Sequence, residues 1–457
     1  MSDTQKKRET PTQMNSSSLP DDLFERAHIA ESMCRYIVET PHEIISPVIL
    51  DGPWGCGKTI HVKRMRNYFR KNYGDSVKCI YWNAAMSDFS SDPLPMFAAA
   101  LHDSIPPEEQ DKYGKKALAM CYGGALGATL SIGRQMLDAK LGVRLDQVKE
   151  DAKAGANFFN IKTNIEKQFS DFLKTAVKEK ERIDAARSLV QMVKGHAKNL
   201  IIVIDELDRC RPDFALKMIE SIKHLFSEID CKFILVMNKK SIYSAIMHLY
   251  GLERNESIDY LSKYIKRNFR LPQIIIQNGR HVSCTWHYFV TLLNKDGNSL
   301  QTEGILLESF AKYIFEEKNL NLRDIEKIVS SINFIQSTLP DTSKPSKNVF
   351  FDCLIFFLAY LLTFELDLAT KIAEKNTTSN QVLAAINHNP NSIRLNDKHT
   401  NNCITFIKGV FDYYFANSST TKNAIINRIS KEDIDFDTIQ CCSKALHTWI
   451  SYATFLQ

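Results

Sequence analysis

The chain has 457 residues, more than one hydrophobic core usually organises, so we expect two or three domains. Hydrophobic residues make up 44% of it and charged residues 24%, as in an ordinary soluble globular protein, and a net charge of +5 is too small for this length to indicate nucleic acid binding by itself. The 11 cysteines, an odd number without C-x-x-C spacing, argue against a disulfide framework and a zinc site and favour a reducing, cytoplasmic compartment.

The first 20 residues differ in composition from the rest of the chain. They are polar, rich in Ser, Thr and Lys, and contain no apolar segment, so we expect a disordered tail and no secretory signal. From Asp21 to Val38, apolar residues then repeat at helical spacing, which predicts a helix. Ser46-Pro47 breaks the chain after that helix.

The stretch Val48–Ile60, VILDGPWGCGKTI, reads as a short apolar strand, a glycine-rich loop and the start of a helix. From Gly52 to Thr59 its spacing is G-x-x-x-x-G-K-[ST], the phosphate-binding P-loop. Glycine allows positive φ and close approach of the backbone, so successive N–H groups can point at phosphate oxygens. The helix dipole adds to the same site. The predicted nucleotide contacts are Gly52, Pro53, Trp54, Gly55, Cys56, Gly57, Lys58, Thr59 and Ile60.

Two residues of this loop have specific predicted roles. Lys58 would reach the β and γ phosphates as a point charge, and the Thr59 hydroxyl would bind Mg²⁺. The run from Ile60 to Tyr73 contains neither Pro nor Gly and is amphipathic, which predicts the helix that the motif requires. The next elements are a strand over Val77–Trp82 and a helix over Leu94–Leu101.

The segment Ala117–Gly133 has two interpretations. It contains no charged residue, and Gly123 and Gly127 have the G-x-x-x-G spacing of close-packed membrane helices. Its length lies at the lower edge of what spans a bilayer, and its small residues suit a soluble helix packed on another helix, the interpretation we favour. Leu137–Lys198 follows as a charged helical insert between two core strands.

A second group of candidate site residues follows Leu200–Ile204 (LIIVI), an apolar run typical of a strand buried on both faces of a parallel sheet. Because open α/β sheets bind ligands beyond the carboxyl ends of their strands, the acids that follow should lie beside the P-loop. Asp205 would hold Mg²⁺ as the Walker B acid, and Glu206 would polarise the attacking water as general base. Asp208 and Arg209 are candidates for metal, trans-subunit or structural ion-pair contacts.

Two further elements complete the predicted core. Phe214–Ile229 is an amphipathic helix, and Lys232–Met237 (KFILVM) is a strand that ends at Asn238. Asn238 has two open interpretations: it positions the attacking water or senses the γ phosphate, or it caps the helix that begins near Lys240.

The C-terminal part, from Gln273 onward, is predicted to be mostly helical. Ser337–Asn348 reads as a linker and Asn376–Asn401 as a mobile loop. The apolar run CLIFFLAYLLTF within Phe350–Phe364 is too short to span a bilayer and predicts a buried core helix. No second catalytic constellation is visible here.

Together these motifs resemble the KAP family of P-loop NTPases. GPWGCGKT fits a G-x-W-G-x-G-K-[ST] pattern, and YWNA at Tyr81–Ala84 fits the family's aromatic-Asn strand end. IDELDRC-x-P at Ile204–Pro212 and YLSKYIKRNFRLP at Tyr260–Pro272 fit two further segments. The resemblance covers about Asp21 to Pro272, with a weaker echo at Asn321-Leu322-Arg323.

The resemblance implies an α/β P-loop NTPase core with a parallel sheet of the additional-strand type, related to AAA+ and STAND ATPases, a helical insert and an all-α C-terminal region. The implied domains are a tail over 1–20, the NTPase core over 21–93 and 199–272, the insert over 94–198, a helical lid over 273–340 and a C-terminal helical domain over 341–457. The family carries membrane helices in the insert, where this chain has only the weak candidate 117–133, so the alternative to a cytoplasmic location is inner-membrane association through that segment.

The resemblance also implies ATP hydrolysis with Mg²⁺, in a homo-oligomer that serves bacterial defence against phage with companion effector proteins. A nucleotide-gated switch with little turnover is the alternative. Arg323 would sense the γ phosphate from the lid and Arg209 would be a finger, although exposed ion pairs account equally well for both arginines. Lys263 and Arg267 belong to a basic cluster that we interpret as a solvated face, so a nucleic acid partner is not favoured.

Overall fold

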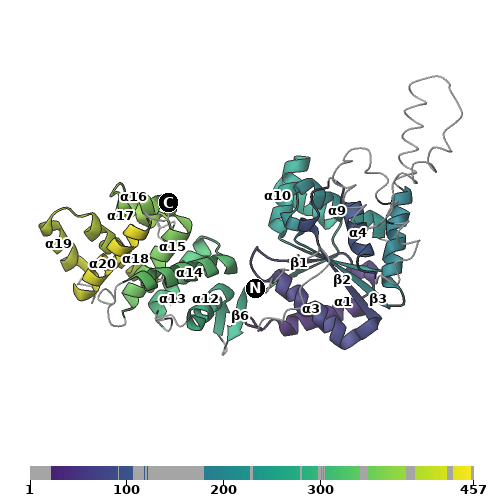
Figure 1. Cartoon of the computed structure of the whole chain (residues 1–457), viewed down its shortest axis with the longest axis horizontal. Coiled ribbons are helices and arrows are strands. Elements are labelled where there is room, and N and C mark those ends of the chain that lie inside the picture. The colour runs from purple at the N-terminus through teal and green to yellow at the C-terminus, as the bar shows by residue number, and fades with distance from the viewer. Residues whose placement is uncertain are drawn as a thin grey trace, which may run out of the picture. The chain divides into compact units, whose positions relative to one another are not determined.

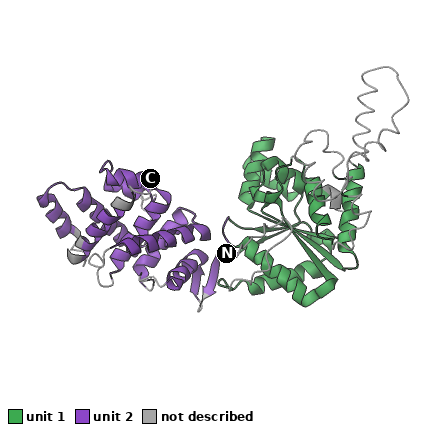
Figure 2. Cartoon of the chain, in the orientation of Figure 1, with its two compact units in different colours: residues 1–53, 57–271 green, residues 54–56, 272–457 purple. Residues whose placement is uncertain are grey.

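The computed structural model (Figure 1) describes residues 22–90, 92–105, 118, 121, 180–226, 230–277, 280–296, 300, 302, 304–339, 348–386, 397–429 and 436–453. The chain divides into two compact units (Figure 2): the first unit comprises Met1–Pro53 and Gly57–Leu271, and the second unit comprises Trp54–Cys56 and Pro272–Gln457. The predicted tail over 1–20, nearly all of the segment 117–133 and the insert over 137–179 lie outside the described residues.

A parallel five-stranded sheet forms the centre of the first unit. Its strands follow the order β2-β3-β4-β1-β5, so β4 lies between the strand that leads into the P-loop and the strand that ends in the acids. This is the additional-strand arrangement that the family resemblance implied. The strands are β1 (Val48–Asp51), β2 (Val77–Asn83), β3 (Asn199–Asp205), β4 (Lys232–Met237) and β5 (Arg267–Arg270).

Helices cover both faces of this sheet, with α1 and α3 on one side and α4, α9 and α10 on the other (Figure 1). The helices of the first unit are α1 (Ala27–Glu39), α2 (His42–Ile45), α3 (Lys58–Tyr73), α4 (Pro93–His102), α9 (Pro212–Phe226), α10 (Lys239–Tyr250) and α11 (Arg254–Ser262), and residues 180–194 are also helical. The first of them begins later than predicted, because the Asp22 carboxylate accepts hydrogen bonds from the N–H groups of Arg26 (3.0 Å) and Ala27 (2.6 Å) and so fixes its start.

Buried aromatic rings connect the helices α4 and α9 to the strands of the sheet. The ring of Trp82 on β2 lies 5.4 Å from Phe97 on α4 and 6.5 Å from Phe214 on α9. Phe97 in turn lies 6.2 Å from Phe233 on β4, and all four side chains are almost fully buried. Aromatic pairs at these separations add to the free energy of area burial, so they stabilise the packing of α4 and α9 on β2 and β4.

Two strand elements were not predicted from the sequence. β5 is an edge strand beside β1, and three of its four residues are exposed, so it lacks the apolar alternation that marks a half-buried strand. The second unit begins with an antiparallel hairpin of β6 (Ile274–Gln277) and β7 (Arg280–Ser283), where mainly helix was expected. The β-branched run at Ile274–Ile276 is the signal that favours a strand there.

The rest of the second unit is helical, as predicted. Its helices are α12 (Cys284–Lys295), α13 (Ile305–Glu317), α14 (Leu322–Thr338), α15 (Val349–Phe364), α16 (Leu366–Ala373), α17 (Ser379–Ala384), α18 (Lys398–Phe415), α19 (Ser419–Ile429) and α20 (Phe436–Ala453). The helix α17 lies inside the segment predicted as a loop, and the Thr378 side chain, which accepts a hydrogen bond from the N–H of Gln381, caps it.

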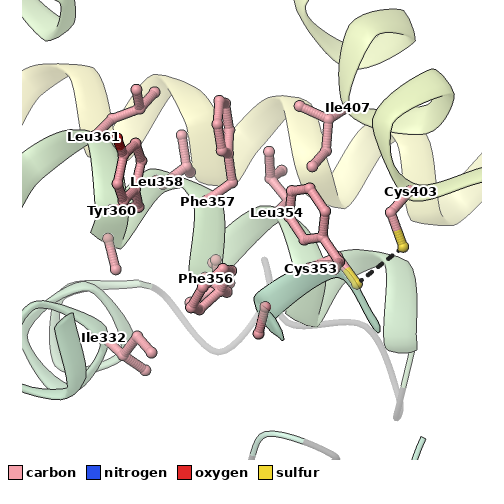
Figure 3. Packing of buried hydrophobic residues seen from close by; sticks show 14 of the residues in the cluster. Ile332, Cys353, Leu354, Phe356, Phe357, Leu358, Tyr360, Leu361, Cys403 and Ile407 are labelled. Carbon is pink, nitrogen blue, oxygen red and sulfur yellow. Dashed lines mark hydrogen bonds between the residues drawn. The ribbon is translucent and has the colours of Figure 1, made fainter. Parts of the chain in front are cut away.

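The helix α15 is the centre of this unit, and every residue from Phe351 to Leu361 is buried. Figure 3 shows its apolar side chains packed against neighbouring helices, with Cys353 beside Cys403. The predicted buried core helix is therefore confirmed. Among the described residues, no single helix is long and apolar enough to cross a membrane; α15 and α16 pass that test only as a pair, bent by 115°.

His61 on α3 is a buried polar residue with a predicted effect on stability. Only 2% of it is exposed, and neither ring nitrogen has a hydrogen-bond partner among the residues that the structure describes. Burial lowers the pKa of His61 to about 4, and the nearby Arg26 and Arg64 charges act in the same direction. In the unfolded chain the imidazole binds a proton near pH 6.5, so folded-state stability is expected to decrease as the pH falls from about 6.5 toward 4.

We expect His61→Leu to remove this dependence. Between pH 7 and pH 5, wild-type protein should lose about 2 kcal/mol of unfolding free energy that the variant retains, as measured by denaturant unfolding at both pH values. The exposed His196 provides the matched control, since His196→Leu should keep the wild-type slope. Equal losses in wild type and His61→Leu would show that His61 is not the proton-linked group.

Candidate functional site

The glycine-rich loop has the backbone that the motif requires. Gly55 has a φ of 73° and Gly57 a φ of 90°, in the left-handed region that other residues rarely adopt. Gly57 is the N-cap of α3, and no described side chain caps that helix. A helix N-terminus without a side-chain cap offers its N–H groups to an anion, so the local geometry suits a phosphate.

The side chain of Lys58 folds back over the loop. Its ammonium donates hydrogen bonds to the carbonyl oxygens of Gly52 (2.7 Å) and Pro53 (3.1 Å). The flexible stem of a lysine allows the same charge to turn toward phosphate oxygens. Of the other predicted nucleotide contacts, Ile60 and Trp54 are 41% and 50% exposed, whereas Cys56 is buried.

The predicted metal ligands Thr59 and Asp205 meet, although they lie 146 residues apart in the chain. The Thr59 hydroxyl donates to Oδ2 of Asp205 at 2.9 Å, and the backbone N–H of Glu206 donates to Oδ1 at 2.8 Å. Burial raises the pKa of the Asp205 carboxyl, while these two donors lower it. A hydroxyl and a carboxylate are the hard oxygen ligands that Mg²⁺ prefers.

The donor set is small, which also fits magnesium. Among the described residues, no group of three or more His, Cys, Asp or Glu side chains is placed to hold a metal ion. Mg²⁺ commonly binds one or two protein oxygens and completes its shell with water and substrate phosphates. Thr59 and Asp205 therefore fit a magnesium ion that arrives with a nucleotide better than an ion held by the protein alone.

Tyr81 supports Asp205 and was not predicted as a site residue. Its hydroxyl donates to Oδ2 of Asp205 at 3.1 Å. Burial raises the pKa of Tyr81, and the neighbouring Asp205 charge adds to this effect, so the phenol stays protonated and remains a donor. Tyr81 precedes Asn83 by two residues at the end of β2, in a segment that the sequence predicted as a strand and that fits the family's aromatic-Asn strand end.

We expect Tyr81→Phe to weaken the metal site without disturbing the fold. Loss of a hydrogen bond that orients a metal ligand commonly costs about tenfold or more in metal affinity or activity. The Mg²⁺ concentration for half-maximal saturation should therefore rise by about that factor in a magnesium titration. Tyr243→Phe is the control, because that hydroxyl has no hydrogen bond to any described residue. An unchanged magnesium titration in Tyr81→Phe would contradict this role.

The carboxylate of Glu206 is held on both oxygens. Oε1 lies 3.1 Å from Nη2 of Arg209, and Oε2 accepts a hydrogen bond from Nδ2 of Asn83 at 3.0 Å. Glu206 itself has a φ of 60°, an uncommon conformation for a residue other than glycine. The sequence predicted the base but gave Asn83 no role; its signals were its position at the end of a strand and the match of YWNA to the family's aromatic-Asn strand end.

Asp208 and Asn238 form a structural connection between two strand ends. The backbone N–H of Asn238 donates to Oδ2 of Asp208 at 2.9 Å. The side chain of Asn238 accepts a hydrogen bond from the N–H of Lys240 at 3.1 Å and so caps α10. This contact of Asp208 is a hydrogen bond with a backbone N–H and not an ion pair, so the predicted roles of Asp208 stay predictions, as does a role for Asn238 at the γ phosphate.

Two arginines complete the description. Arg323 is exposed in the first turn of α14 in the second unit, and its role as a sensor stays a prediction. Arg26, in the first unit, was not predicted: a Cβ atom built on Gly57 would lie 3.6 Å from its Nη1 atom. Phe24 carries the same guanidinium over its ring at 4.8 Å. Arg26 is thus a buried positive charge next to the P-loop.

Comparison with known proteins adds one decisive match. The family model described as "KAP family P-loop domain" matches residues 26–339. A comparison with curated proteins finds no match. Among solved structures, the Aeropyrum Pernix ORC2 protein in ADPNP-ADP complexes has 11% identity and a TM-score of 0.38, and its ADP form has 13% identity and a TM-score of 0.36. Each comparison covers 96% of this chain and 97% of the other. TM-scores this low establish no shared fold.

Proposed function

The chain belongs to the KAP family of P-loop domains, and from this premise we propose that it binds ATP with Mg²⁺ and hydrolyses it to ADP and phosphate. One observation carries the proposal: the P-loop hydroxyl of Thr59 and the buried carboxylate of Asp205 lie 2.9 Å apart, and Glu206 follows directly in the chain. This brings together the phosphate loop, the metal ligands and a base, which are the parts that phosphoryl transfer requires.

The chain's residues would divide the work of the reaction. The loop N–H groups and Lys58 hold the β and γ phosphates, and Thr59 and Asp205 hold the metal ion. Bound Mg²⁺ supplies positive charge to the β and γ oxygens. Glu206 orients a water whose oxygen attacks the γ phosphorus as the bond to the β-phosphate oxygen breaks, and the water's proton passes to Glu206 or to the phosphate product.

The test is phosphate release from ATP by the purified chain, with Mg²⁺ and with EDTA in its place. Release that requires Mg²⁺ and saturates with ATP supports the proposal. Binding of ATP, measured by calorimetry, with no release at any magnesium concentration would leave nucleotide binding intact and remove hydrolysis.

A second candidate function is a nucleotide-gated switch with little turnover. The observation that favours it is the double restraint on Glu206, whose oxygens are held by Arg209 and Asn83. A carboxylate whose two oxygens each already have a partner, one of them a cation, is a weaker base, so turnover in this arrangement would be slow. ATP-dependent change in oligomeric state without phosphate release, followed by light scattering, would identify the switch.

The biological setting is proposed from the family resemblance alone. We propose that hydrolysis drives a conformational or assembly cycle of a homo-oligomer, in the cytoplasm, and serves anti-phage defence with companion effector proteins. Plaque counts on bacteria that carry the wild-type gene, compared with the Glu206→Gln variant, test the defence role. Recovery of the full-length chain only in the membrane fraction would instead support attachment through 117–133.

A further inference from the structure

The two groups that hold Glu206 differ in how firmly they are themselves held. Asn83 is fixed at both ends of its amide: Nδ2 donates to Glu206, while Oδ1 accepts a hydrogen bond from the N–H of Ala85 at 3.1 Å. Together the two bonds fix the orientation of the amide, because only Nδ2 can donate to a carboxylate and only Oδ1 can accept from an N–H. Asn83 is therefore a built-in part of the strand end.

Arg209, in contrast, is held only by its ion pair. Its side chain is 38% exposed, and within the described residues its only ion pair is the one with Glu206. It reaches back because η4 (Leu207–Arg209) forms a tight turn in which the N–H of Arg209 donates to the carbonyl oxygen of Glu206 at 3.0 Å. A partly exposed pair of this kind is weak enough to break and reform.

The ion pair opposes the chemistry expected of Glu206. A general base must accept a hydrogen bond from the attacking water, and a guanidinium on Oε1 both occupies that oxygen and neutralises its charge. Phosphate oxygens bind a guanidinium in the same forked geometry as a carboxylate does, so they can compete for Arg209.

We propose that Arg209 is an inhibitory restraint on Glu206, released when the phosphate oxygens of a bound nucleotide draw the guanidinium away. Asn83 stays in place throughout and positions the freed carboxylate. The proposal rests on the proposed hydrolysis at this site and gives that site a regulatory step. It also reverses the sign of the effect expected from Arg209 as a finger, whose loss would lower the rate.

The first test is the rate of phosphate release by Arg209→Ala at saturating ATP and Mg²⁺. Removal of the restraint is expected to raise the rate about three- to fivefold, the factor that corresponds to loss of a partly exposed ion pair of up to about 1 kcal/mol. Arg211→Ala is the matched control: it makes the same charge change two residues away, where the side chain pairs with Asp213 at 3.4 Å. A rate equal to or below wild type in Arg209→Ala overturns the proposal.

The dependence of the rate on salt concentration distinguishes the restraint from a merely structural role of Arg209. Because salt screens exposed charges, raising the ionic strength should increase the wild-type rate relative to Arg209→Ala, which has no pair to screen. A parallel response of the two proteins contradicts the restraint.

A double-mutant cycle tests the restraint independently of hydrolysis. Thermal unfolding of wild type, Arg209→Ala, Glu206→Gln and the double variant should show a favourable coupling between the two residues without nucleotide, and this coupling should weaken with Mg²⁺ and a non-hydrolysable ATP analogue, because the phosphate oxygens compete for Arg209. A coupling that is absent at the start, or that the nucleotide leaves unchanged, overturns the proposal. If no variant releases phosphate, the proposed hydrolysis fails, and the cycle still decides whether the restraint exists.

Discussion

Glu206→Gln is expected to lower phosphate release by roughly a hundred- to a thousandfold while ATP binding stays close to that of wild type. The amide has the same shape as the carboxylate and still offers an oxygen to Nδ2 of Asn83, which lies 3.0 Å from the native oxygen. It has no negative charge with which to accept a proton or orient the water, and a positioned base typically contributes factors of this size. The loss should therefore fall on turnover rather than on binding.

The measurement is a comparison of single-turnover phosphate release with ATP affinity from calorimetry. Glu39→Gln, at the exposed end of α1, makes the same chemical change away from the site and should leave both quantities unchanged. Equal phosphate release in wild type and Glu206→Gln would contradict catalysis through this residue. If Glu39→Gln releases phosphate at the wild-type rate but Glu206→Gln no longer binds ATP, then Glu206 acts in nucleotide binding and not in turnover.

Phe356→Ala is expected to reduce the stability of the second unit by about 3–5 kcal/mol, the usual cost of removing a fully buried phenyl ring. Phe356 lies on α15 with no exposed surface, and its ring makes edge contacts with Phe289 at 5.6 Å, Phe310 at 5.9 Å and Phe315 at 5.8 Å. Truncation leaves a cavity that three rings from two other helices line. Those rings belong to the folded core and cannot all move inward.

Denaturant unfolding followed by circular dichroism measures this loss. Phe334→Ala, on α14 with 37% of its surface exposed, is the matched control and should change the stability by less than about 1 kcal/mol. A loss in Phe356→Ala as small as in the control would show that α15 is not the centre of this core. The denaturant midpoint of the second unit should fall in Phe356→Ala. Nucleotide binding by the first unit should stay unchanged.

Much of the core could be predicted from local patterns. The strands β1, β3 and β4 are continuous apolar runs, since both of their faces are covered, and their bounds differ little from those predicted. The edge strand β5 could not be found in this way, because three of its four residues are exposed and two of them are charged. The helix α17 was missed for a different reason: its six residues, in a segment rich in Asn, Ser and Thr, are too few to show a helical repeat.

The candidate site was predicted in its parts but not in its contacts. Thr59 and Asp205 were expected to meet because motif and strand order require it, and the hydrogen bond between them agrees with that expectation. The supporting residues Tyr81 and Asn83 were not predicted, because their roles depend on the register in which β2 pairs with β3. That register sets Asn83 opposite Asp205.

The sequence by itself determined the chemistry that this chain carries: a phosphate loop, an apolar strand that ends in acids, and a buried core helix, each readable from spacing because each depends on neighbours in the chain. Only the tertiary structure decided how that chemistry is held. The pairing of Arg209 and Asn83 with Glu206 depends on a left-handed residue, a tight turn and a neighbouring strand that meet in space. The contact of Asn83 leaves no periodic signal because it joins segments 123 residues apart in the chain. The contact of Arg209 is local, but it depends on the left-handed conformation of Glu206 and on a tight turn, which residue spacing does not reveal.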